Sequence, residues 1–279
     1  MEFQTISAGG QPFVVHTAGD GPDVVLLHGF PDTPYSWRQT AQALVDAGWR
    51  VSVPWLRGYR QETLVAGRGY DPETLGRDAL ALLDALGVTS AVLVGHDWGA
   101  LEAYVAATLA PERVRALVAV AIPHPSLLQR TPASLWAARH FLALKLPWAT
   151  RSCRRNDFAY LEELYRRWAP GWSGEERDEC LRLVKEAFGS DATLAGAIAY
   201  YRDLPLGRAP VLARVPEVPG LVVGGTRDLV DAGLFTRTAE LLAAGSRALI
   251  VEGAGHWPHR EREGVVVPQI VEFLGGFAG

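Results

Sequence analysis

The sequence is poor in cysteine and in long apolar runs, and it has no excess of positive charge. Only Cys153 and Cys180 occur among 279 residues, which excludes a framework of several disulfide bonds and leaves a single bridge open. No stretch approaches the about 18 uninterrupted apolar residues of a membrane-spanning helix. With a net charge of -4 and no basic run, the chain has no electrostatic footprint for nucleic acid or an anionic membrane surface. We therefore expect neither partner.

The amino terminus lacks the marks of a signal peptide. Residues 1–10 contain no charged segment followed by an apolar core, so the expected location is cytoplasmic, although a mature chain whose signal had been removed would look the same. Metal-ligating residues do not cluster at close spacing in the sequence, so we expect no metal and no cofactor. With 279 residues, the chain can form one large domain with an inserted piece or two modest domains, either as a monomer or as a homodimer.

Short apolar runs alternate with segments of helical periodicity along most of the chain. This alternation predicts an α/β fold with a mostly parallel central sheet and helices on both faces. A weakly alternating hairpin, residues 3–6 and 12–17, is expected at a sheet edge. The other expected strands are 23–27, 50–54, 92–94, 114–122, 220–224 and 248–251, and the expected helices are 36–47, 72–86, 100–109, 232–243 and 265–273.

The alternation is interrupted after residue 122. From residue 123 to residue 210 only helical periodicity appears, with tryptophans at 136, 148, 168 and 172. We therefore predict a core domain of residues 1–122 and 211–279, with an all-helical lid of residues 123–210 inserted in it. Open α/β sheets bind ligands beyond the carboxyl ends of their strands, so the residues that follow each strand are the candidates for chemistry.

The segment 92–100 has the pattern of a strand, a tight turn and a helix. Gly95 and Gly99 flank Asp97, and small neighbours are what a nucleophile elbow requires, here with aspartate where serine is usual. The alternative is an ordinary turn between a strand and a helix. In the elbow interpretation, we expect Asp97 to stand exposed at the top of the sheet.

Two further candidates follow the last two strands. His256 lies in a glycine-rich loop, which favours a catalytic base over a structural histidine. Asp228 is expected to accept the second imidazole N–H, which would fix the tautomer of the ring. Asp231 is the alternative acid, and it is also the better candidate to cap the helix that follows.

The chain order nucleophile, acid, histidine resembles the α/β-hydrolase superfamily, and specifically the epoxide hydrolase family with its aspartate nucleophile. Residues 28–31, His-Gly-Phe-Pro, look like the HGxP motif of that branch, and residues 95–100 look like its elbow. The resemblance implies that the backbone N–H groups of Phe30 and Trp98 form the oxyanion hole. It also implies that His28 and His96 are structural.

The lid carries a second resemblance. Residues 197–202 are similar to the segment that supplies a ring-opening tyrosine in epoxide hydrolases, and the register implies Tyr201, with Tyr200 in the lid core. His140 stands where most of these enzymes have a second tyrosine, which resembles the His/Tyr subset. The alternatives are a core aromatic at position 201 and a solvent-facing histidine at 140. The side chains expected to bind substrate are Trp98, Phe30, Phe141 and Leu144; Leu142 and the lid tryptophans also suggest an apolar cavity.

The resemblance implies hydrolysis of a small apolar epoxide by water to a vicinal diol. Asp97 would form an alkyl ester, and His256 with Asp228 would activate the water that hydrolyses it, while Tyr201 and His140 assist ring opening. A haloalkane or haloacid dehalogenase with the same Asp–His–Asp triad is the alternative enzyme. A non-catalytic ligand receptor on this fold is the third hypothesis, and it predicts a broken triad.

Overall fold

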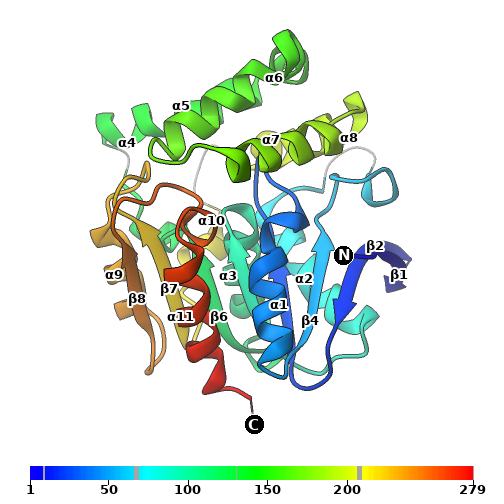
Figure 1. The fold of residues 1–279 in the computed structure, drawn as a ribbon, viewed down its shortest axis with the longest axis vertical. Coiled ribbons are helices and arrows are strands. Elements are labelled where there is room, and N and C mark those ends of the chain that lie inside the picture. Colours follow the sequence, from blue (N-terminus) through cyan, green and yellow to red (C-terminus); the bar gives the residue numbers. More distant parts are fainter. Residues whose placement is uncertain (9, 66–68, 130, 206–208, 279) are drawn as a thin grey trace.

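The computed structural model describes residues 1–8, 10–65, 69–129, 131–205 and 209–278 (Figure 1). Its centre is an eight-stranded sheet in the order β1-β2-β4-β3-β5-β6-β7-β8. The β1–β2 and β2–β4 pairs are antiparallel and all the others are parallel, which confirms the mostly parallel sheet with a hairpin at its edge. The strands are β1 (Gln4–Ala8), β2 (Gln11–Ala18), β3 (Asp23–Leu27), β4 (Arg50–Trp55), β5 (Ala91–His96), β6 (Val114–Val120), β7 (Gly220–Gly225) and β8 (Arg247–Val251).

Helices cover both faces of this sheet, and β3 illustrates why its strands are continuously apolar. Val24 and Leu26 pack with α1 and α11 on one face, whereas Val25 and Leu27 pack with α2 and α3 on the other. These helices are α1 (Arg38–Asp46), α2 (Pro72–Ala85), α3 (Trp98–Leu109), α9 (Gly233–Leu241), α10 (Pro258–Glu261) and α11 (Glu263–Gly275). Short 3-10 helices are η1 (Pro34–Trp37), η2 (Gln61–Thr63), η3 (Pro111–Arg113), η4 (Pro125–Leu127) and η5 (Pro210–Ala213).

Between β6 and β7 the described residues form helices and loops only. These helices lie over the carboxyl ends of the parallel strands, and together we call them the lid (Figure 1). The exact division at residues 122 and 211 stays a prediction. In the described ranges, no helix combines the length and the apolar character needed to cross a membrane. The lid helices are α4 (Pro132–Ala137), α5 (Arg139–Lys145), α6 (Ala149–Trp168), α7 (Glu175–Ala187) and α8 (Asp191–Asp203).

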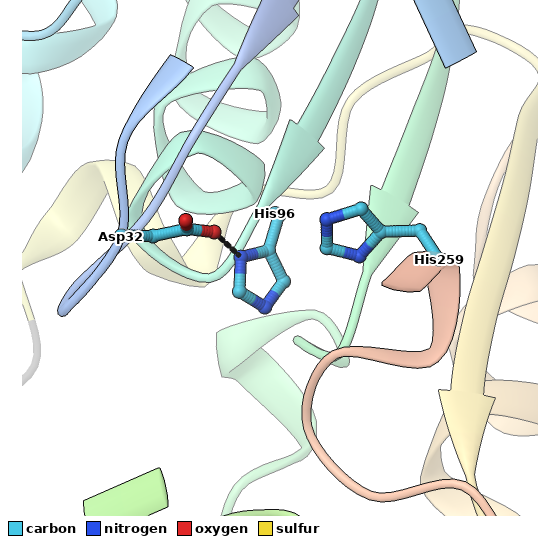
Figure 2. Close-up of side chains that lie close together, drawn as sticks. All are labelled: Asp32, His96 and His259. Carbon is cyan, nitrogen blue, oxygen red and sulfur yellow. Dashed lines mark ion pairs between the residues drawn. The ribbon is translucent and has the colours of Figure 1, made fainter. Parts of the chain in front are cut away.

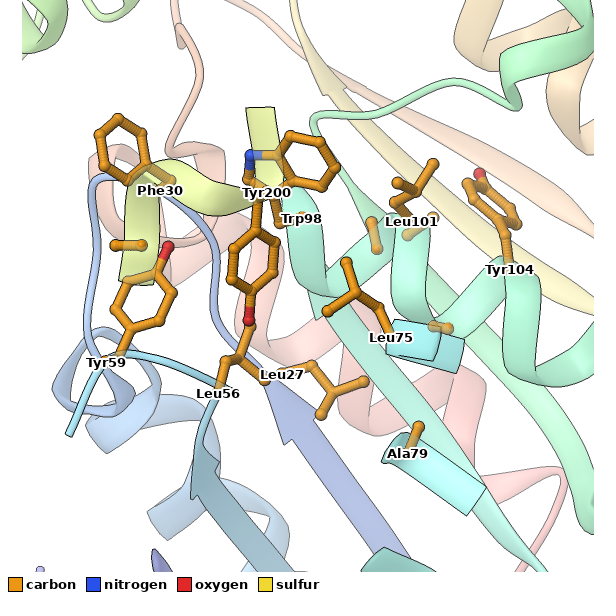
Figure 3. Close-up of a cluster of buried hydrophobic side chains, with 14 of the residues drawn as sticks. Leu27, Phe30, Leu56, Tyr59, Leu75, Ala79, Trp98, Leu101, Tyr104 and Tyr200 are labelled. Carbon is orange, nitrogen blue, oxygen red and sulfur yellow. The ribbon is translucent and has the colours of Figure 1, made fainter. Parts of the chain in front are cut away.

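Helix α8 joins the lid to the core. The ring of Tyr200 lies 5.4 Å from that of Trp98 (Figure 3). Its hydroxyl donates a 2.9 Å hydrogen bond to the Arg57 carbonyl. Gly196 and Gly58 allow the two backbones to meet, because a Cβ atom on either glycine would collide with the other. The next side chain along α8, Tyr201, is thereby fixed above the elbow helix α3.

Candidate active site

The turn after β5 has the backbone strain of a nucleophile elbow. Asp97 adopts φ 51° and ψ -117°, a conformation that costs about 1–3 kcal/mol for a residue with a side chain. A Cβ atom on Gly95 would collide with the carbonyl of Gly99, and one on Gly99 would collide with that of Leu27. The small neighbours are therefore required by the close approach of β5, α3 and β3.

The Asp97 side chain is buried, contrary to the expectation that it stands exposed. Only 8% of the residue is accessible, because the lid and the loops after β3 and β8 surround the top of the sheet. Its Oδ1 accepts a 2.8 Å hydrogen bond from the Phe30 N–H, and its Oδ2 lies 3.4 Å from His256 Nε2. Burial alone would raise the pKa of this carboxyl, but the imidazole and the Phe30 N–H outweigh burial and lower it.

The second oxyanion candidate, Trp98, is the first residue of α3. The first N–H groups of a helix have no partner within the helix, so α3 itself does not use the N–H of Trp98, the residue that follows Asp97. The indole ring of Trp98 also contacts Tyr201, with the ring centroids 5.1 Å apart in a T-shaped arrangement. This contact places the indole ring against a lid tyrosine.

His256 lies between two carboxylates. Its Nδ1 is 3.0 Å and 3.1 Å from the two oxygens of Asp228, whose side chain is fully buried. Burial would lower the pKa of His256, but the negative charges of Asp228 and Asp97 outweigh burial and raise it to about 10. Asp231 lies elsewhere: it is exposed, and its Oδ1 accepts a hydrogen bond from the Gly233 N–H at the start of α9.

The loop around His256 is held by groups that sequence reasoning missed. The buried carboxylate of Glu261 accepts hydrogen bonds of 2.9–3.0 Å from the N–H groups of Gly255 and Trp257, which flank the histidine. The N–H of His256 itself donates 2.9 Å to the Trp168 carbonyl of the lid. The only sequence signal was a glutamate shortly after the histidine, which is not specific.

Tyr201 of α8 and His140 of α5 are buried lid residues, both near enough to Asp97 to be influenced by its charge. Tyr201 is 1% exposed, and burial together with the negative charge of Asp97 raises the pKa of its hydroxyl well above the ordinary value. His140 is 6% exposed, its ring is 5.9 Å from that of Tyr201, and burial and then Arg167 lower its pKa to about 3. The alternative of a solvent-facing histidine at position 140 is therefore wrong.

The expected apolar lining is only partly present. The Phe141 ring is 5.0 Å from Tyr201 and 6.3 Å from Trp98, and Leu144 is buried in the same apolar cluster. Leu142 faces solvent because it lies between these two positions on the turn of α5 and so points outward. Of the lid tryptophans, those at 168 and 172 are buried, whereas those at 136 and 148 are exposed.

The remaining histidine and cysteine predictions concern structure. The Leu56 N–H donates to His28 Nε2, and burial lowers the pKa of His28 to about 4, so this ring is a neutral link between two loops. His96 Nε2 lies 2.8 Å from the His256 carbonyl and likewise connects two loops. Cys153 and Cys180, whose pairing the sequence left open, are both free and buried.

Comparisons with known proteins agree with this geometry. The profile of the alpha/beta hydrolase fold family matches residues 22–263. The chain is 31% identical to AB hydrolase superfamily protein YfhM of Bacillus subtilis over 98% of both chains, and 31% identical to Epoxide hydrolase A of Mycobacterium tuberculosis over 91% of both. The crystal structure of Epoxide Hydrolase A from Mycobacterium thermoresistibile is similar with a TM-score of 0.80 at 28% identity, covering 99% of this chain and 98% of that one. The similarity therefore extends over both the core and the lid.

Proposed function

Because the chain belongs to the α/β-hydrolase family and, within it, to the epoxide hydrolases, we propose that it converts a small apolar epoxide and water to a vicinal diol through an ester on Asp97. It is thus a hydrolase that acts on the ether bond of its substrate. One observation carries the mechanism: Asp97 Oδ1 accepts the Phe30 N–H, while Oδ2 lies 3.4 Å from the His256 ring that Asp228 holds.

The two oxygens of Asp97 have different tasks in this proposal. Oδ2 attacks an epoxide carbon, and the carbon–oxygen bond of the ring breaks as the ester bond forms. Oδ1 becomes the carbonyl oxygen of the ester and keeps its hydrogen bond from the Phe30 N–H. A carboxylate needs no base for this attack, because its lowered pKa keeps it ionised at neutral pH.

The oxygen released by ring opening must receive a proton, because an alkoxide is a poor leaving group. We propose that Tyr201 donates this proton and that His140 donates a hydrogen bond to the same oxygen. The raised pKa of Tyr201 supports this role, since the hydroxyl is protonated before the reaction. Arg167 lies 3.4 Å from His140 Nδ1, and guanidinium can only donate, so this contact favours the tautomer with the N–H on Nε2 that the proposal requires.

The ester is then hydrolysed with His256 as the base. The imidazole accepts a proton from water as the water oxygen attacks Cγ of Asp97, and the N–H groups of Phe30 and Trp98 stabilise the negative charge that develops on Oδ1. The bond from Cγ to Oδ2 breaks, and Oδ2 leaves in the diol after taking the proton back from His256. Esterification removes one of the negative charges that raise the pKa of His256, so the ring releases its proton more readily at this stage, and this proton returns to the Tyr201 phenolate. The proton that water leaves on the regenerated Asp97 carboxyl then passes to His256, which restores both groups.

An oxygen-18 experiment tests the proposed function. A single turnover of excess enzyme on an epoxide in oxygen-18 water should give unlabelled diol and place the label on Asp97, as read by mass spectrometry. Label in the diol after one turnover would exclude the ester. A parallel panel of epoxides and haloalkanes separates the alternatives: released halide without diol would indicate a dehalogenase, and tight binding without product would indicate a receptor.

A further inference from the structure

A second polar cluster lies just behind the active site. Asp32 comes from the loop after β3, His96 is the last residue of β5 and His259 lies in α10, and their side chains converge in the interior (Figure 2). Each residue is at most 1% exposed, and one ligand atom from each lies within 4.8 Å of the other two. Sequence spacing could not reveal this group, because its members are far apart along the chain.

The hydrogen bonds around His96 leave its Nδ1 lone pair facing the carboxylate of Asp32 without a proton between them. Nε2 lies 2.8 Å from the His256 carbonyl, which can only accept, so Nε2 carries the proton and a neutral ring has a bare lone pair on Nδ1. That lone pair faces Asp32 Oδ2 at 3.3 Å. Two buried electron-rich atoms at this distance repel each other unless a positive charge lies between them.

A proton and a metal ion are the two simplest positive charges, and the distance distinguishes them. An imidazolium that donates to a carboxylate lies about 2.7–2.9 Å from it. Two ligands of a tetrahedral zinc ion, each about 2.0–2.1 Å from the metal, lie roughly 3.3–3.4 Å apart. The 3.3 Å separation between His96 and Asp32 matches one edge of such a tetrahedron. The ligand atom of His259 lies within 4.8 Å of the other two and would move closer to them when the ion binds.

The surroundings of His259, the third member of the cluster, also favour a metal ion. Neither ring nitrogen of His259 has a hydrogen-bond partner among the described residues, and the ring is held in place by stacking on Trp37 at 4.4 Å. If His96 and Asp32 shared a proton, the nitrogens of this buried ring would still have no bonding partner among the described residues, whereas a metal ion would bind the nitrogen lone pair. Arg260, the cation next to His259, is itself paired with Glu263.

We propose that Asp32 Oδ2, His96 Nδ1 and His259 bind a divalent metal ion of the zinc class. The outer contacts are those usual for such ligands: His96 donates its other N–H to a carbonyl, and Asp32 Oδ1 accepts a 2.7 Å hydrogen bond from the Thr33 N–H. The ion would connect the loops that carry Phe30, Asp97 and His256. It takes no part in the reaction and stabilises the relative positions of these loops.

Metal titration of the full chain tests this proposal without any substrate. After dialysis against a chelator, one equivalent of Co²⁺ should produce the visible absorption of a tetrahedral site with nitrogen and oxygen ligands. Zn²⁺ should compete for it and, at a hundredfold excess over Kd, raise Tm by roughly 5–10 °C. His259→Gln should weaken binding at least tenfold and abolish the tetrahedral spectrum, whereas the control His16→Gln, at the β1–β2 edge, should not.

Wild-type protein that binds neither ion would overturn the proposal, whatever the variants do. Equal binding by His259→Gln and wild type would overturn it too, because the ion would then lie elsewhere. Asp32→Asn provides a second ligand variant of nearly the same shape in case His259→Gln fails to fold, as judged by circular dichroism. Nitrogen-15 NMR of the metal-free protein would identify the proton alternative as an imidazolium at His96.

Discussion

His256→Gln should separate the two chemical steps and trap the ester on Asp97. The substitution removes the base that lies 3.4 Å from Oδ2 but leaves Oδ1 on the Phe30 N–H, so attack on the epoxide continues. Loss of a positioned base slows the dependent step about 10²–10⁴-fold. If the two steps have similar rates in the wild type, a hundredfold slowdown would convert about 99% of the enzyme to the ester at saturating substrate.

Intact-protein and peptide mass spectrometry measure this outcome directly. The peptide that contains Asp97 should gain the full mass of the epoxide, because the oxygen released from carbon stays in the attached group. A haloalkane would add only its alkyl group, since halide leaves. His16→Gln is the matched control: like the wild type, it should be about half ester at saturating substrate under the same assumption of similar rates and lose the added mass once the substrate is consumed. Asp97→Asn should remain unmodified. An unmodified His256→Gln protein with wild-type turnover would refute the two-step scheme.

Three other perturbations test the lid and the histidine loop. Tyr201→Phe should slow diol formation about 10²-fold by rapid kinetics, whereas Tyr200→Phe should have much less effect; equal losses would indicate lid packing. Because the pKa of His140 is lowered to about 3, the unfolded chain binds its proton first, so stability should fall from pH 6.5 towards 3 by up to about 1.4 kcal/mol per unit. His140→Gln should flatten that slope in urea unfolding, and an unchanged slope would contradict the burial argument. Glu261→Ala leaves two buried N–H groups unpaired and should cost about 2–5 kcal/mol, with a smaller loss for Glu261→Gln; equal unfolding midpoints would show that these bonds add little.

The fold was predictable because its signals are local. The run in β3 is apolar on both faces, and this pattern alone predicts a strand covered by helices on both sides. The elbow was predictable for a similar reason, since Gly95 and Gly99 reveal the close backbone approach around Asp97. Each of these inferences needs only a short window of sequence.

Properties that depend on side-chain direction were not predictable. Phe141 and Leu144 face inward while Leu142 faces solvent, and the helical rotation that decides this is set by packing against α8. The choice between Asp228 and Asp231 was open for the same reason, because both follow β7 within a few residues. Only the path of the loop turns the first towards the imidazole and leaves the second exposed, where it accepts the Gly233 N–H at the start of α9.

A backbone hydrogen bond from His256 to Trp168 couples the catalytic base of the core to the lid. The sequence suggests that the core supplies the triad, whose residues all follow core strands, and that the lid supplies only the ring-opening Tyr201 and His140. In the structure the His256 N–H is bound by the Trp168 carbonyl at the end of α6, and the imidazole ring lies 5.0 Å from the Trp168 ring. A displacement of α6 would therefore move the base as well as open the site. Lid substitutions that shift this helix should alter ester hydrolysis even when they touch no substrate.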